Sequence, residues 1–285
     1  MSMSNGKGFE NEHSDNKMEN KEFSSAFKGN NNKSSAKNDK INNTYDILNV
    51  NSNFDKNKHR IWELDFFRGI ALLLMIYFHV IFDLSDIFGY NVDYTVGLNK
   101  LAGRMAGILF ILISGISCSL SRNNFKRALK ILAVAIGISI VTHVFDPNMG
   151  IKFGILHFLG LSILLYPLLR KLNGYLLAII GTMILIAGNL ITKINVTYDY
   201  LFILGITSNR FISADYYPLI PWLGIFIYGI ILGEILYKEK KSIFRFQMKD
   251  NIIMWLGRNT LLIYIIHQPI IIFIIAAIRK LLYSI

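Results

Sequence analysis

The sequence predicts an all-α, polytopic membrane protein of about seven transmembrane helices, preceded by a disordered polar N-terminal tail. The 285-residue chain has a mean hydropathy of +0.40, although about its first sixty residues are rich in Asn, Lys, Ser and Glu. The rest must therefore be far more apolar than this mean. From Phe67 onward, apolar runs of roughly 17 to 22 residues recur with few internal charges, which is the length needed to cross a hydrocarbon core of about 30 Å.

The predicted tail covers residues 1–58. It contains runs such as NNNKSSAKNDKINN and very few aliphatic side chains. Such a segment cannot bury enough apolar surface to offset the entropy of ordering the chain, so we expect it to be disordered. Acidic and basic residues nearly balance there, which leaves most of the formal charge of +11 to the membrane domain, residues 59–285.

The membrane helices are predicted from the apolar runs in chain order. Each run is long enough to span the bilayer, and the polar residues between runs mark the connections. The expected helices cover residues 67–88, 102–120, 128–144, 153–169, 175–191, 218–236 and 260–282.

Basic residues of the connections alternate along the chain. The connections after the second, fourth and sixth predicted helices carry the larger share of Lys and Arg, which predicts a cytoplasmic N-terminus and an extracytoplasmic C-terminus in the cell membrane. In a soluble protein the net charge would suggest nucleic acid, but here topology explains it, and we expect membrane lipid and no nucleic acid as a partner. The basic residues concerned are Arg122, Lys126, Arg127, Arg170, Lys171, Lys238, Lys240, Lys241, Arg245 and Lys249.

Polar side chains share one face of the first predicted helix. Ionisable groups at membrane depth normally face the bundle interior and pair with one another, and His79 and Asp83 are four residues apart. A purely structural pair is the alternative, but it does not account for the other polar groups on the stripe. At about 100° per residue, one face within roughly 80° holds Asp65, Arg68, Leu72, Ile76, His79, Asp83 and Asp86.

Further histidines lie in later predicted helices. His157 lies near the start of the fourth, and His267 lies in the seventh, two residues before Pro269, whose missing N–H opens the local helix ladder. Each is also open to a structural interpretation, as a hydrogen-bonding residue between helices. The single cysteine, Cys118, permits no internal disulfide and no cysteine metal cluster. We expect no bound metal.

Four segments together resemble a known family. They read ELDFFRGIALLLMIYFHVIFDL, FGILHFLGLS, YYPLIPWLGIFIYGIILG and WLGRNTLLIYIIHQP, in this order between Arg60 and Ile272. They are similar to the bacterial membrane proteins related to heparan-alpha-glucosaminide N-acetyltransferase. The resemblance implies a transmembrane acyltransferase that takes acetyl from cytoplasmic acetyl-CoA and delivers it to a glycan or amino-sugar acceptor on the far side, as an amide or an ester.

Roles for the candidate residues follow from this reading. His79, oriented by Asp83, is the expected general base, because a pKa near neutrality suits imidazole to that task. A covalent acetyl-imidazole on His79 or His267 is the variant mechanism, and His157 and His267 are second choices for the base or for a donor to the thioester carbonyl. The cations expected to bind the acetyl-CoA phosphates are Arg68, Arg122, Lys126 and Arg127. For Arg68, an i, i+3 pair with Asp65 is the alternative.

Two rival functions remain at this point. An acyltransferase-3-type O-acyltransferase has a similar helix count and use of histidine. A proton-coupled permease or exporter would use the same His and Asp groups as a proton relay. Paired broken helices in inverted halves would favour the transporter, and the sequence shows none. A homo-oligomer is compatible with all three.

Overall fold

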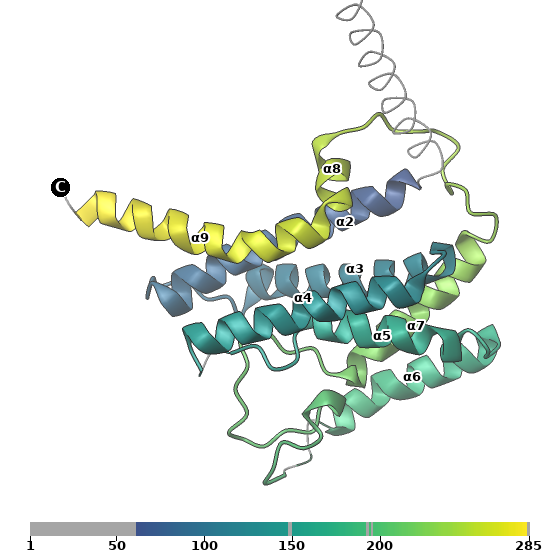
Figure 1. Cartoon of the computed structure of the whole chain (residues 1–285), viewed down its shortest axis with the longest axis horizontal. Coiled ribbons are helices and arrows are strands. Elements are labelled where there is room, and N and C mark those ends of the chain that lie inside the picture. The colour runs from purple at the N-terminus through teal and green to yellow at the C-terminus, as the bar shows by residue number, and fades with distance from the viewer. Residues whose placement is uncertain (1–60, 148–149, 192–193, 195, 284–285) are drawn as a thin grey trace, which may run out of the picture. The chain divides into compact units, whose positions relative to one another are not determined.

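The computed structural model describes residues 61–147, 150–191, 194 and 196–283. The predicted N-terminal tail lies outside these residues. From Ile61 onward the chain forms one compact unit, whose described part is helical (Figure 1). In chain order the elements are α2 (Trp62–Phe82), the π-helix η1 (Asp83–Ile87), α3 (Gly97–Leu120), α4 (Asn124–Phe145), α5 (Ile155–Leu169), α6 (Gly174–Ile191), the 3-10 helix η2 (Phe202–Leu204), α7 (Leu219–Leu236), α8 (Ile252–Arg258) and α9 (Thr260–Tyr283).

The predicted all-α membrane fold is confirmed. Within the described ranges, six helices are long and apolar enough to cross a membrane, and α5 is a shorter apolar helix. All seven predicted helices are present, with boundaries within about five residues of those expected. α2 begins earlier than predicted, at Trp62, because the charged residues Glu63 and Asp65 are buried inside the bundle and do not mark a surface connection.

Helix α8 was missed by the sequence analysis. It has seven residues, too few to give a helical period, and it lies between the end of α7 and the start of α9. The Asn251 side chain caps it by accepting a hydrogen bond from the Met254 N–H at 3.0 Å. α8 packs closely on α2, since a Cβ added to Gly257 would lie only 1.8 Å from the carbonyl oxygen of Asp65.

Helix α7 packs between α3 and α6 through glycine contacts. A Cβ at Gly229 would lie 2.3 Å from the carbonyl oxygen of Leu112 in α3. A Cβ at Gly224 would lie 2.7 Å from the carbonyl oxygen of Gly181 in α6. Small residues let helix backbones approach closely, which is how membrane helices pack without a hydrophobic driving force between them. α4 packs on α5, and α2 packs on α3, α8 and α9.

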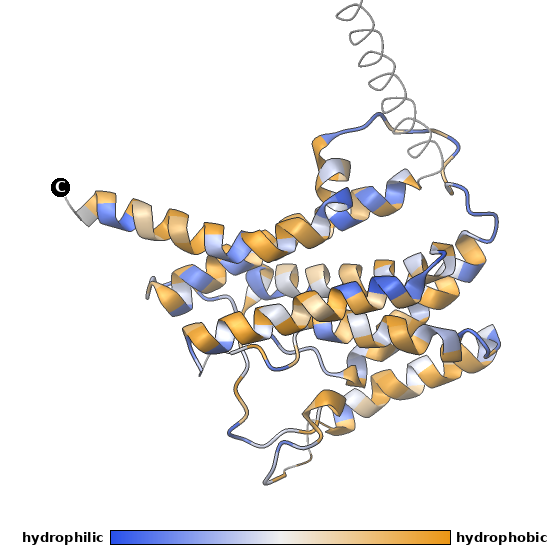
Figure 2. Cartoon of the chain, in the orientation of Figure 1, coloured by the Kyte–Doolittle hydropathy of each residue, from blue (hydrophilic) through white to orange (hydrophobic). Residues whose placement is uncertain are grey.

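Apolar side chains cover the outer faces of the long helices (Figure 2). A protein in water rarely exposes so large a contiguous apolar surface, whereas a bilayer requires it. The pattern therefore fits an integral membrane protein. On α4 and α6 the exposed apolar residues include Phe125, Leu129, Ile136, Ile140, Val141, Val144, Phe145, Leu176, Ile179, Met183, Ile186 and Leu190.

Candidate functional site

Two histidines meet between the first and the last long helix. His79 comes from the last turn of α2 and His267 from the third turn of α9. Their ring centroids are 4.9 Å apart, and the ring planes are inclined by 61°. The sequence analysis proposed both residues separately, and the structure brings them into direct contact.

A backbone contact fixes the tautomer of His267. Its Nδ1 donates a hydrogen bond to the carbonyl oxygen of Tyr264 at 2.6 Å. A neutral imidazole protonated at Nδ1 carries its lone pair on Nε2. The Nε2 atom of His267 is buried, and so is Nδ1 of His79, and neither has a hydrogen-bond partner among the described residues. The pair thus presents an imidazole lone pair inside the bundle.

The Asp83 side chain hydrogen-bonds to α9 and not to the His79 ring. Asp83 begins the π-helix η1, is fully buried, and accepts a 2.6 Å hydrogen bond from the Gln268 side-chain amide. The Asp83 backbone N–H donates to the His79 carbonyl oxygen at the end of α2, but within the described part of the chain no hydrogen bond joins the two side chains. The i, i+4 spacing places both side chains on the side that faces α9, where His79 meets His267 and Asp83 meets the next residue, Gln268. The sequence analysis expected Asp83 to orient His79, whereas in the structure the Asp83 side chain binds Gln268.

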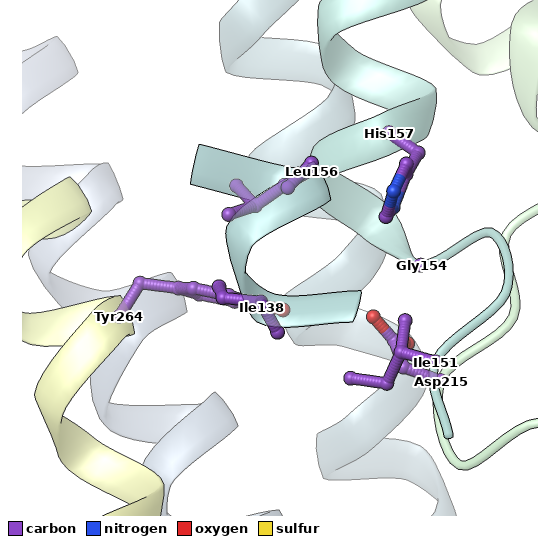
Figure 3. A pocket seen from close by; sticks show the side chains of 8 residues that line it. Ile138, Ile151, Gly154, Leu156, His157, Asp215 and Tyr264 are labelled. Atoms are coloured by element: carbon purple, nitrogen blue, oxygen red, sulfur yellow. The ribbon is translucent and has the colours of Figure 1, made fainter. Parts of the chain in front are cut away.

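Tyr264 connects the histidine pair to a second group of polar residues. Its side chain extends from α9 toward α5 and hydrogen-bonds to Asp215, which lies in the connection before α7 (Figure 3). Asp215 also accepts a 2.9 Å hydrogen bond from the Ile155 N–H at the start of α5. Burial raises the pKa of Asp215 to about 6, against the opposing effect of these hydrogen bonds. This carboxyl thus ties the connection to two helices.

His157 lies in this second group. Its Nε2 is 3.3 Å from the Ser139 hydroxyl of α4. The ring lines a pocket of about 170 Å³, counted with its open mouth, together with Asp215, Tyr264 and Gly154 (Figure 3). The sequence analysis named His157 but missed Asp215, Tyr264 and Gln268. Signals for two of them were present, because Tyr264 and Gln268 stand in the segment IYIIHQP that was singled out for His267.

The four cations expected to bind the acetyl-CoA phosphates lie toward the end of the bundle opposite to the two histidines. Arg68 donates to Asp65 at 2.7 Å and to the Ser117 hydroxyl of α3, as the i, i+3 alternative anticipated. Arg127 lies against the same turn of α3, with its Nη2 atom 3.2 Å from the Ser114 carbonyl oxygen. The remaining two, Arg122 and Lys126, are exposed at the start of α4.

No cluster of three or more His, Cys, Asp or Glu side chains in the described ranges is arranged to hold a metal ion. Two of the carboxyl groups accept hydrogen bonds from neutral side chains, Asp83 from the Gln268 amide and Asp215 from the Tyr264 hydroxyl.

A family model supports the resemblance seen in the sequence. The model described as heparan-alpha-glucosaminide N-acetyltransferase, catalytic, matches residues 60–269. The chain belongs to this family. Membership of the heparan-alpha-glucosaminide N-acetyltransferase family implies acyl transfer as the general activity of the membrane domain, and the matched range includes both His79 and His267. Comparisons with curated proteins and with solved structures find no match.

Proposed function

We propose that the chain transfers an acetyl group from acetyl-CoA to an amine or hydroxyl group of an extracytoplasmic sugar. The observation that carries this proposal is the contact of His79 with His267, in which the buried Nε2 of His267 has no partner among the described residues. A buried imidazole lone pair of fixed tautomer suits proton abstraction or nucleophilic attack. Family membership supports acyl transfer as the reaction class.

The histidine pair can divide the work of acyl transfer. The acceptor nitrogen or oxygen attacks the thioester carbonyl carbon and gives its proton to Nε2 of His267. The neutral His79 ring carries one N–H, which can donate a hydrogen bond to the oxygen of the tetrahedral intermediate. The carbon–sulfur bond then breaks, and the sulfur of coenzyme A takes the proton from His267. In this proposal His267 takes the role of base that the sequence analysis gave to His79.

The polar groups beside the histidines suit a sugar substrate that carries several hydrogen-bond donors. Oδ2 of Asp83 and Oε1 of Gln268 are buried acceptors without a hydrogen-bond donor among the described residues. Leaving such atoms unpaired costs about 1–3 kcal/mol each, so a ligand that supplies N–H or O–H groups gains by binding here. A sugar amine or hydroxyl has this chemistry.

Acetyl-CoA, the acyl donor, has to reach the histidines from the end of the bundle where α2 begins. His79 lies about 26 Å from the start of α2, at 1.5 Å per residue. Arg122 and Lys126 are exposed at that end and available for the coenzyme A phosphates. With the N-terminus in the cytoplasm, as the loop charges favour, the histidines lie toward the extracytoplasmic side. The acetyl group then crosses the membrane along α2.

The test uses the purified full chain in proteoliposomes with acetyl-CoA. Release of the coenzyme A thiol is measured with a thiol reagent, and acetylated product is identified by mass spectrometry with an amino sugar as acceptor. A matched acceptor with its amine already acetylated separates amide from ester formation. Absence of thiol release in all cases would contradict the proposal. Sugar uptake driven by a proton gradient, without thiol release, would support the permease instead.

A further inference from the structure

The connection between α7 and α8 is rich in exposed basic residues. Residues 237–251 leave the end of α7, pass the start of α2 and enter α8, at the upper right of Figure 1. We call this segment the basic loop. Its five cations are exposed, and they are Lys238, Lys240, Lys241, Arg245 and Lys249.

The two acidic residues of the basic loop do not neutralise it. Glu239 pairs with Lys241 at 3.3 Å, and Asp250 pairs with Arg258 of α8 at 2.9 Å. Among the described residues, the other four cations of the loop form no ion pair. An exposed positive charge thus remains, which the loop does not balance from within.

Aromatic rings alternate with these cations and mark an interfacial position. Phe244 and Phe246 stand on either side of Arg245 and are 44% and 58% exposed. Both pack against Trp62, with ring centroids 5.5 and 5.4 Å from its ring. Trp62 is the first residue of α2, so the cluster lies where a membrane helix begins. Tryptophan is enriched at such membrane–water boundaries, and Trp62 places the two phenylalanines beside it.

The basic loop is held close to the helix ends. The Ile243 N–H donates to the buried Glu63 carboxylate of α2 at 2.8 Å. The chain leaves α7 through Lys240, whose φ of 54° is a left-handed conformation that glycine usually supplies. A lysine therefore occupies a position where the backbone favours a residue without a Cβ. Both features keep the cations near the level of the first turn of α2.

We propose that the basic loop binds the headgroups of anionic phospholipids, with Phe244 and Phe246 inserted at the membrane interface. Clusters of four or more cations beside a membrane helix attract anionic lipid near the membrane surface. The lysine and arginine stems extend along apolar surface and keep their charges at headgroup level. Unbalanced charge, exposed aromatic rings and attachment to the start of α2 all suit a lipid headgroup.

The test compares anionic and zwitterionic lipid on the full-length chain in neutral detergent. Phosphatidylglycerol or phosphatidylcholine is added, bound lipid is counted by native mass spectrometry, and the Tm is recorded. We expect phosphatidylglycerol to be retained and to raise the Tm of the wild type. In the variant K238Q/K240Q/R245Q/K249Q we expect at least a tenfold loss of retained phosphatidylglycerol and no rise in Tm. Equal retention by both proteins would overturn the proposal.

Two further variants keep the result interpretable. The exposed cations Arg170 and Lys171 lie on the short connection between α5 and α6, away from the cluster of Trp62, Phe244 and Phe246, so R170Q/K171Q should behave like the wild type. The swap K238R/K240R/R245K/K249R keeps the charge and should retain lipid even if the neutral variant folds poorly. A loss in R170Q/K171Q equal to that in the loop variant would overturn a specific role for the loop. A rise in Tm on addition of soluble coenzyme A, without phospholipid, that is lost in the loop variant would also overturn the proposal. The loop cations would then bind the acyl donor.

Discussion

The carbonyl oxygen of Tyr264 lies 2.6 Å from Nδ1 of His267 and decides which nitrogen of that ring is basic. With Nδ1 protonated, the lone pair is on Nε2, the atom that faces no described hydrogen-bond partner. The contact uses the backbone, so it survives substitution of the tyrosine side chain. His267 can therefore be tested apart from the groups around it.

The first prediction concerns His267 itself. We expect His267→Ala to lower acetyl transfer per folded molecule by about 10² to 10⁴, the usual contribution of a general base. The folded yield and the affinity for acetyl-CoA should change little, because the base acts in the transition state. Turnover is measured as coenzyme A release, and folding as the elution profile in detergent. Near-normal turnover would exclude His267 as base and return that role to His79.

The second prediction concerns the coupling of His79 to His267. Because the rings touch, their effects should not add: His79→Ala should lower turnover, and the double variant should be little worse than the worse single variant. The measurement is a double-mutant cycle on kcat/KM. Asp83→Asn serves as comparison, and we expect it mainly to raise the acceptor KM, since Asp83 contacts Gln268. Simple multiplication of the single losses would show that the histidines act independently.

The third prediction concerns pH and Asp215. Burial raises its pKa from 3.8 to about 6 in the folded chain. Between these values the folded state binds more protons than the unfolded state, so the free energy of unfolding falls as pH rises from about 4 to about 6 and is then constant. The Tm of the wild type, minus that of Asp215→Asn at the same pH, should fall across this window. A difference that rises with pH would mean that the carboxylate is the favoured form.

The fourth prediction concerns the close contact of α7 with α3. Gly229→Ala places a Cβ 2.3 Å from a backbone oxygen, so the helices must separate, at a cost of about 1–3 kcal/mol. Gly137→Ala in α4 is the matched control. No atom lies within 4 Å of a Cβ added there, and replacing a helical glycine should be neutral or stabilising by up to about 1 kcal/mol. Thermal unfolding in detergent measures both.

The fifth prediction concerns orientation. If the basic connections face the cytoplasm, a cysteine introduced at Lys241 should resist an impermeant thiol reagent in intact cells, and one at Asp199 should react. Both positions lie outside the membrane helices. The native Cys118 is buried and gives little background. Labelling at Lys241 alone would invert the topology.

The helices were predictable because membrane spans depend on length and hydropathy, which are local properties. The start of α2 was not predictable, because Glu63 and Asp65 look like surface residues in the sequence. Only the structure shows that Glu63 accepts a hydrogen bond from the basic loop and that Asp65 pairs on its own helix. The short helix α8 was missed because its stability comes from packing on α2 more than from its own sequence.

The sequence identified individual residues of the site, but it did not predict which of them contact one another. Spacing on one helix suggested His79 with Asp83, since only neighbours along the chain can be compared without a structure. The partners come from α9, nearly two hundred residues away, and the register of two helices is not visible in either sequence. Asp215 carries no periodic signal, because it lies in an irregular connection. Its role depends on contacts with Ile155 and Tyr264.

The glycine contacts of α7 also limit which helices can shift during turnover. At Gly115 and Gly229 the α3 and α7 backbones touch, and at Gly181 and Gly224 so do those of α6 and α7. Three helices in backbone contact behave as one rigid body. α9, in contrast, meets α2 through side chains and contains Pro269, whose missing N–H leaves the helix easier to bend beside His267. Opening of the site to a substrate would then be a flexing of α9 against a stationary frame.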